Sequence, residues 1–97
     1  MLQVRWTKNA LHSQQKILKY WIKHNSSNVY SKKLRKEIKT KEKLICKNPL
    51  MGSTLEFENI KYVLIDKNYS LYYRVKTDFI EVIAFWDNRR NPDYLEL

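Results

Sequence analysis

Several features that would assign this chain to a class of protein at once are missing from it. No apolar run approaches the roughly 20 residues of a membrane-spanning helix, and no charged-then-apolar signal segment opens the sequence. The single cysteine, Cys46, cannot form an internal disulfide, which is typical of a protein from a reducing cytosol. Cys46, His12 and His24 lack the spacing of metal ligands, so we expect neither a metal site nor a cofactor. We also find no repeat or linker, which indicates a single domain over residues 1–97.

Acidic residues are scarce in the first half of the chain. Residues 1–50 hold thirteen Lys and Arg against two acids, an excess of eleven positive charges, whereas the whole chain carries a net charge of +9. The second half is therefore slightly acidic. Such asymmetry favours a polyanionic partner, either nucleic acid or an acidic protein, although a lysine-rich solvated face is the simpler interpretation for any single lysine.

Hydrophobic spacing near 3.6 predicts two helices in the first half. Alternation in residues 2–6 predicts a short strand, and Thr7 is a suitable N-cap for a helix reaching His24. The turn at 25–27 leads to a second helix from about Asn28 to Lys47, so the pair forms an αα-hairpin. The apolar face of the first helix is expected to contain Ala10, Leu11, Leu18, Trp21 and Ile22, and that of the second Tyr30, Leu34, Ile38 and Ile45.

The second half of the chain changes to a period of two. Residues 54–58, 60–66, 69–76 and 79–86 each read as strands, and the turns between the last three are too short for anything but antiparallel hairpins. The predicted fold is α+β: an N-terminal strand, an αα-hairpin and an antiparallel meander of three or four strands. The helices must cover one face of the sheet, since a lone meander buries too little surface.

Two arginines follow the most apolar strand and are the first candidate site. Arg89 and Arg90 come directly after 79–86, and a fixed guanidinium at the end of a buried strand is well placed to bind phosphate or carboxylate. A plainer interpretation is that they pair with Asp87 and Asp93 and fasten the C-terminal segment. A second candidate surface is the basic helix, where Lys32, Lys33, Lys36 and Lys39 would bind a phosphate backbone in a salt-dependent way.

Several local features stand in a fixed order along nearly the whole chain. They are Trp6, Ala10, Ile17, Tyr20, Trp21, Ser27, Ile38, Leu44 and the segments 48–52, 69–75 and 86–92. In their order and spacing they resemble the RelE/ParE superfamily of bacterial toxins from type II toxin–antitoxin modules.

The resemblance implies a toxin held inactive by a cognate antitoxin, with two possible activities. RelE-like members cut mRNA on the ribosome without a metal, whereas ParE-like members bind DNA gyrase and block replication. Both act in the cytoplasm, away from any membrane. The antitoxin is expected to be acidic, and the pair to contact operator DNA only through it.

The RelE-like pattern of catalytic residues is half kept. Position by position it implies catalytic roles for Arg89, Lys61 and, one place off, Tyr94, but Val63 and Ser70 stand where the pattern has a lysine and an arginine. Losing one fixed donor at a developing anion typically costs about 10²–10³ in rate. The sequence therefore favours a gyrase-binding inhibitor, with Arg89, Arg90 and the helical lysines contacting the target, over an mRNA endonuclease. A third hypothesis is a non-toxic basic protein that acts only in nucleic-acid binding or operon repression.

Overall fold

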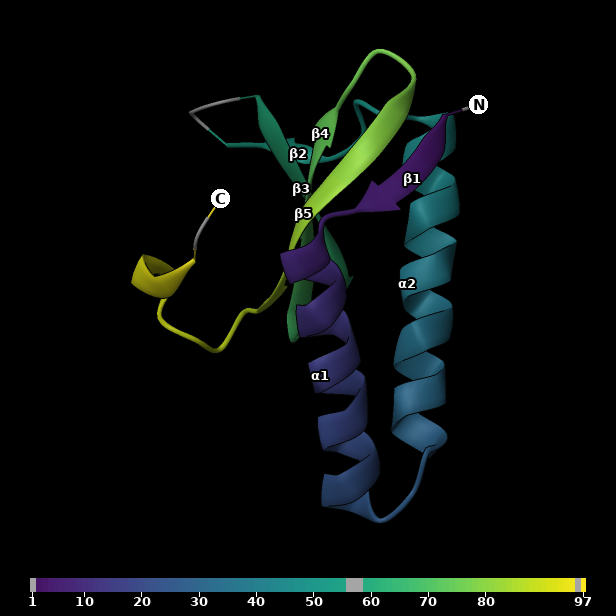
Figure 1. Cartoon of the computed structure of the whole chain (residues 1–97), viewed down its shortest axis with the longest axis vertical. Helices are drawn as coiled ribbons and strands as arrows, with labels where there is room; N and C mark the ends of the chain where they lie inside the picture. Colours follow the sequence, from purple (N-terminus) through teal and green to yellow (C-terminus); the bar gives the residue numbers. More distant parts are fainter. Residues whose placement is uncertain (1, 56–58, 96) are drawn as a thin grey trace.

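In the part of the chain that the structure describes, a strand, two helices, four further strands and a short 3₁₀ helix follow one another. The computed structural model describes residues 2–55, 59–95 and 97, and Figure 1 shows its arrangement. The elements are β1 (Gln3–Trp6), α1 (Lys8–Asn25), α2 (Val29–Lys47), β2 (Ser53–Thr54), β3 (Ile60–Asp66), β4 (Tyr69–Val75), β5 (Phe79–Asp87) and the short 3₁₀ helix η1 (Pro92–Tyr94). The predicted α+β class is confirmed.

The boundaries of both helices follow from their capping residues. Thr7 has an extended backbone and its hydroxyl accepts a hydrogen bond from the Ala10 N–H at 3.1 Å, which starts α1 as predicted. Ser26 adopts the left-handed conformation (φ 50°) that commonly ends a helix, and the next N–H then bonds back to the Ile22 carbonyl. The Ser27 hydroxyl accepts from the Val29 N–H at 3.2 Å and closes the turn before α2, whose N-cap residue Asn28 makes no side-chain capping bond.

The five described strands form one sheet in the order β1-β5-β4-β3-β2. The pairs β2·β3, β3·β4 and β4·β5 are antiparallel, which confirms the predicted meander, and β1 joins it parallel to β5. A register shift in β4·β5 leaves Ile83 without a partner, because Tyr72 pairs with Ala84 whereas Tyr73 pairs with Val82. Such a bulge bends the strand and increases its twist.

Both helices pack on the same face of this sheet. The core contains Ala10 from α1 and the stripe Leu34, Ile38 and Ile45 from α2, which lie against alternate residues of the strands. The helix-facing residues of β3, β4 and β5 include Val63, Ile65, Tyr69, Leu71, Tyr73, Val82 and Phe85. The C-terminal segment after β5 leaves the sheet on the side away from α2 (Figure 1).

Two predictions need correction: the buried face of α1 and the strand at 54–58. Leu11 and Ile22 of α1 were expected on its buried face, but they are 41% and 43% exposed. The residues of α1 that pack on the core are Ala10, Ile17, Leu18 and Trp21. The strand predicted at 54–58 is a two-residue strand, Ser53–Thr54, in the described chain; residues 56–58 lie outside the described part. In the described ranges, no helix is long and apolar enough to cross a bilayer.

Candidate functional site

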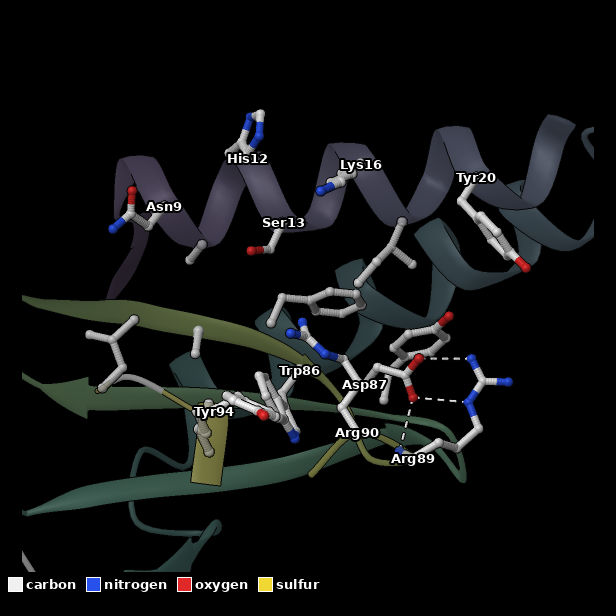
Figure 2. A pocket seen from close by; sticks show the side chains of 17 residues that line it. Asn9, His12, Ser13, Lys16, Tyr20, Trp86, Asp87, Arg89, Arg90 and Tyr94 are labelled. Atoms are coloured by element: carbon white, nitrogen blue, oxygen red, sulfur yellow. Dashed lines mark hydrogen bonds and ion pairs between the residues drawn. The ribbon is translucent and has the colours of Figure 1, made fainter. Parts of the chain in front are cut away.

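An open groove of about 510 Å³ lies between α1, the second half of β5 and the segment that follows it. Figure 2 shows α1 along one side and the side chains of Trp86, Arg90 and Tyr94 along the other. The volume is in the range of binding sites for small ligands or short peptide segments. Its polar lining includes Asn9, His12, Ser13, Lys16, Tyr20, Asp87, Arg89, Arg90 and Tyr94, and its apolar lining Ala10, Ile17, Tyr69, Ile83, Ala84, Phe85, Trp86 and Leu95.

The wall formed by α1 depends on the small residue Ala10. Ala10 is 1% exposed and packs in the core, so the start of the helix lies close to β5. Asn9, Ser13, Lys16 and Tyr20 follow each other at intervals of four, three and four residues, so they form one stripe along the helix. That stripe is polar and exposed or half-buried, and it lines the groove.

A bidentate ion pair fixes Arg89 at the end of β5. Its Nε donates to Asp87 Oδ1 at 2.9 Å and its Nη2 donates to Oδ2 at 2.8 Å, while its backbone N–H also bonds Oδ1 at 2.9 Å. These bonds from Arg89 hold the pKa of the Asp87 carboxyl below its usual range, and the pair in turn raises the pKa of the guanidinium. The side chains are 53% and 21% exposed, so the pair is partly solvated. The pairing of Arg89 with Asp87, one part of the plainer sequence interpretation, is therefore confirmed.

Aromatic rings complete the surroundings of Arg89. Its guanidinium carbon lies 5.8 Å from the ring centre of Trp21 and 5.9 Å from that of Tyr69, both within the range of cation–π attraction. The Trp21 indole donates a 2.6 Å hydrogen bond to the Tyr69 hydroxyl. Burial raises the pKa of Tyr69, more than this hydrogen bond lowers it. Arg89 is thus held by one carboxylate and by rings from two elements.

The other wall of the groove belongs to Arg90 and Tyr94. The Arg90 guanidinium lies 4.7 Å over the Trp86 ring, and Trp86 is 8% exposed. Tyr94 is 69% exposed at the end of η1, where the Asn91 side chain caps the turn by accepting from the Asp93 N–H at 3.0 Å. Arg90 and Tyr94 are the predicted site residues on this wall of the groove (Figure 2).

Lys61 lies elsewhere. It pairs with Tyr73 on the neighbouring strand, and its Nζ donates to Thr54 Oγ1 at 2.8 Å in the β2–β3 hairpin. Tyr73 and Tyr69 are four residues apart on β4, about 13 Å along a strand. Arg89 lies at the Tyr69 end. The structure therefore brings Arg89 and Tyr94 to one groove and leaves Lys61 outside it.

The two positions that depart from the RelE-like pattern are buried on opposite faces of the sheet. Val63 is 8% exposed and packs in the core under the helices. Ser70 is 2% exposed, and its hydroxyl donates to the Asn88 side chain at 2.8 Å, which ties β4 to the segment before Arg89. Neither position has room for a long cationic side chain without displacing its neighbours.

The predicted lysines form a separate surface on α2. Lys32, Lys33, Lys36 and Lys39 are all exposed, and the groove is lined by α1 rather than α2. Lys32, Lys36 and Lys39, together with Lys43, recur at helical spacing on the side of α2 opposite the buried stripe of Leu34, Ile38 and Ile45. We refer to these four residues as the lysine stripe.

Histidine and cysteine do not gather into a site in the described part of the chain. No three His, Cys, Asp or Glu residues there are placed to hold a metal ion. Cys46 is 8% exposed, and burial raises the pKa of its thiol. His24 stacks on Tyr20 with ring centres 5.3 Å apart, and His12 lies on the rim of the groove.

Comparisons with known proteins agree with this architecture. The family described as "ParE toxin of type II toxin-antitoxin system, parDE" matches residues 4–92. A solved structure of the chromosomal ParDE toxin–antitoxin system from P. aeruginosa is similar, with a TM-score of 0.74 and 18% identity over 90% of this chain and 96% of that one. The YoeB dimer from Staphylococcus aureus gives a TM-score of 0.61 and 17% identity over 86% of this chain and 92% of that one. None of the curated proteins matches the sequence.

Proposed function

The chain belongs to the ParE toxin family of type II toxin–antitoxin systems, and from this premise we propose that it arrests bacterial growth by binding DNA gyrase. In this proposal the toxin performs no chemistry of its own. It acts in the cytoplasm, where it is neutralised by an acidic antitoxin. It contacts operator DNA only as part of that complex.

One observation carries the proposal: Lys61, one of the two cations that match the RelE-like catalytic pattern, lies outside the groove that holds Arg89. Attack of a 2′-hydroxyl on the adjacent phosphate requires a base for its proton and fixed donors at the developing anion. Lys61 bonds Thr54 in another part of the sheet, and Arg89 is paired with Asp87. A carboxylate beside the guanidinium also repels an incoming phosphate. This arrangement suits a binding protein better than a nuclease.

The target-binding surface in this proposal has two parts. Arg90, stacked on Trp86, and the exposed ring of Tyr94 offer the Arg and Tyr side chains that often dominate binding energy at protein interfaces. The lysine stripe on α2 adds long-range attraction to acidic protein or to DNA bound by the enzyme, which accelerates association and weakens as salt rises.

A mutually exclusive activity, RelE-like cleavage of mRNA, is favoured by one observation only. Arg89, Arg90 and Tyr94 line the same groove, so two cations and a phenol lie within one site. In this alternative, Asp87 would have to release Arg89 when substrate binds.

Pulse labelling after induced expression in a bacterial host tests the two activities against each other. We expect thymidine incorporation to collapse within minutes and methionine incorporation to follow later. In vitro, the purified protein should inhibit supercoiling by gyrase and leave mRNA intact in a translation extract. An early fall of methionine incorporation would establish the ribosome as the target. Continued growth with both labels unchanged would make this copy a non-toxic repressor component.

Two matched variants sharpen this test. Lys61→Ala removes a candidate catalytic residue outside the groove, and the gyrase proposal expects unchanged toxicity. Arg90→Ala removes a contact residue inside the groove, and we expect at least tenfold weaker inhibition of gyrase, since arginine interface anchors typically contribute about 2 kcal/mol or more. Loss of toxicity with Lys61→Ala at unchanged stability would support the nuclease instead.

A further inference from the structure

Two cations of the groove have no carboxylate partner. Asp87, the single carboxylate of the described lining, pairs with Arg89. Neither Lys16 on α1 nor Arg90 after β5 forms an ion pair within the part of the chain that the structure describes, and both residues are exposed. The groove therefore keeps an uncompensated positive charge on each of its two walls, and an anion is the kind of ligand that balances it.

The two cations lie on opposite sides of the groove, with a hydroxyl beside one of them. Figure 2 shows Lys16 on the helical side and the side chain of Arg90 directed into the groove from the other side. Ser13 precedes Lys16 by three residues, so both lie on one side of α1, and both line the groove. An ammonium, a guanidinium and a hydroxyl all donate hydrogen bonds, and a phosphate accepts them through several oxygens.

Arg90 is positioned by a ring rather than by a counterion. Its guanidinium carbon lies 4.7 Å from the centre of the Trp86 ring, within the range of cation–π attraction. Trp86 is 8% exposed, so the ring itself is fixed by its neighbours. Stacking uses the face of the guanidinium and leaves the N–H groups at its edge available for two phosphate oxygens. A donor held in this way loses little side-chain freedom when a ligand binds.

An exposed ring on the same wall provides a surface for a base. Tyr94 is 69% exposed and lines the groove together with Arg90. Its N–H bonds the Asn91 carbonyl at 3.1 Å, so the short helix η1 holds its backbone in place. Aromatic side chains bind nucleobases by stacking, because every base has a π-face. The groove, of about 510 Å³, thus combines anion donors with a stacking surface in a volume typical of small-ligand sites.

From these observations we propose that the groove binds a nucleoside monophosphate, with the phosphate between Lys16, Ser13 and Arg90 and the base on Tyr94. A phosphate monoester carries about 1.5 to 2 negative charges at pH 7, which matches the two unpaired cations. The bound ligand covers Arg90 and Tyr94, which belong to the proposed target-binding surface, so it competes with the protein target. The site itself does not depend on gyrase being that target.

Isothermal titration calorimetry with three probes tests which parts of the ligand are recognised. Adenosine 5′-monophosphate carries both parts, adenosine lacks the phosphate, and inorganic phosphate lacks the base. We expect saturable binding of the monophosphate and weaker binding of each of the other two by about tenfold or more. Equal affinity for inorganic phosphate would leave an unspecific anion site, and equal affinity for adenosine would remove the phosphate contact. Either result, or no saturable binding of the monophosphate, would overturn the proposal.

Three substitutions assign the contacts to residues. Lys16→Gln removes a charge that lines the groove, whereas Lys19→Gln makes the same change one turn along α1 on an exposed residue outside it. We expect the first to weaken binding of the monophosphate by about tenfold and the second by less than about twofold. Tyr94→Ala should weaken the monophosphate by about tenfold and leave inorganic phosphate unchanged. Equal effects of the two lysine changes would assign binding to net charge and overturn the site.

Backbone amide shifts measured by NMR locate the ligand on the folded protein. We expect adenosine 5′-monophosphate to shift the amides of Ser13, Arg90 and Tyr94 and to leave those of Lys36 and Lys39 in the lysine stripe unchanged. Shifts confined to the lysine stripe would place the ligand on α2 and overturn the proposal. Because no step involves gyrase or growth arrest, these results and the labelling experiment fail independently.

Discussion

The indole Nε1 of Trp21 donates a 2.6 Å hydrogen bond to the hydroxyl of Tyr69. Trp21 lies near the end of α1 and Tyr69 begins β4, so this bond joins the helical layer to the sheet at the Arg89 end of the groove. Tyr69 is 2% exposed, and its ring also stacks on Phe85 with centres 5.4 Å apart.

Replacing Tyr69 with phenylalanine should therefore destabilise the protein through one hydrogen bond. The Trp21 N–H would lose its acceptor, at a cost of about 1–3 kcal/mol for a buried donor left unpaired. Urea unfolding followed by tryptophan fluorescence measures the change. Tyr72→Phe is the matched control, because Tyr72 is half-buried on the same strand and faces away from the helices; its loss should stay within about 0.5 kcal/mol. Equal losses for both variants would contradict this account.

The ion pair of Asp87 with Arg89 makes stability depend on pH in the acid range. The folded state lowers the Asp87 pKa, so the contribution is present above the unfolded value near 3.9 and is lost as the pH falls through the folded value. We expect wild type to exceed Asp87→Asn in unfolding free energy above about pH 5, and the difference to vanish toward about pH 2. Urea titrations at several pH values measure it. A difference that stays constant with pH would show that the asparagine variant loses packing rather than charge.

Gly52 is required because Tyr73 approaches it closely. A Cβ on Gly52 would lie 2.6 Å from the Tyr73 hydroxyl oxygen and 2.9 Å from the Tyr62 carbonyl. That hydroxyl accepts from the Gly52 N–H at 3.1 Å and donates to the Pro49 carbonyl at 2.8 Å, which fastens the loop after α2 to the sheet. We expect Gly52→Ala to cost about 1–3 kcal/mol.

Gly52→Ala in a Tyr73→Phe background separates the clash with the Tyr73 hydroxyl from the clash with the Tyr62 carbonyl. Removing the hydroxyl relieves the nearer contact, whereas the Tyr62 carbonyl remains, so Gly52→Ala should cost less there but still destabilise. A double-mutant cycle by urea unfolding measures the coupling, expected at about 0.5–2 kcal/mol. Strict additivity would show that the loop moves away from Tyr73 instead of straining against it.

The lysine stripe should control the salt dependence of toxin action. Reversing Lys36 and Lys39 together to glutamate removes attraction on an exposed face and leaves the buried stripe of α2 intact. We expect weaker inhibition of gyrase at low salt and a flatter dependence on salt concentration. Lys67 and Lys76, in turns of the sheet, provide the matched double reversal. Equal weakening by both pairs would assign the effect to net charge rather than to α2.

Local patterns in the sequence predicted most of the fold. Thr7 as an N-cap, the spacing of Leu34, Ile38 and Ile45, and the short turns between β3, β4 and β5 each act over a few residues, and all were confirmed. The pairing of β1 with β5 joins residues near opposite ends of the chain, and no local pattern specifies it. Leu11 was wrongly predicted to be buried. Helical periodicity shows which face of a helix a residue lies on, but not whether another element covers the helix at that position.

The candidate site was harder to predict than the fold. Arg89 and Arg90 stood out after an apolar strand, and the pairing of Arg89 with Asp87 was predicted, but only the structure shows Arg90 stacked on Trp86. The polar stripe of α1 that faces them is visible in the sequence as Asn9, Ser13 and Lys16 at helical spacing. These residues form no recognisable catalytic or binding motif, so the sequence gives no reason to assign them to a site. The separation of Lys61 from this groove follows from strand register, which depends on the bulges in the sheet.

The parallel pairing of β1 with β5 also imposes an order on folding during synthesis. β1 is translated first, but its strand partner emerges only after both helices and two hairpins have been made. Until then, Val4 and Trp6 have no sheet to pack on, and the start of α1 has no β5 to lie against. The groove can form only when β5 has left the ribosome, so the nascent chain lacks this binding surface until β5 is released.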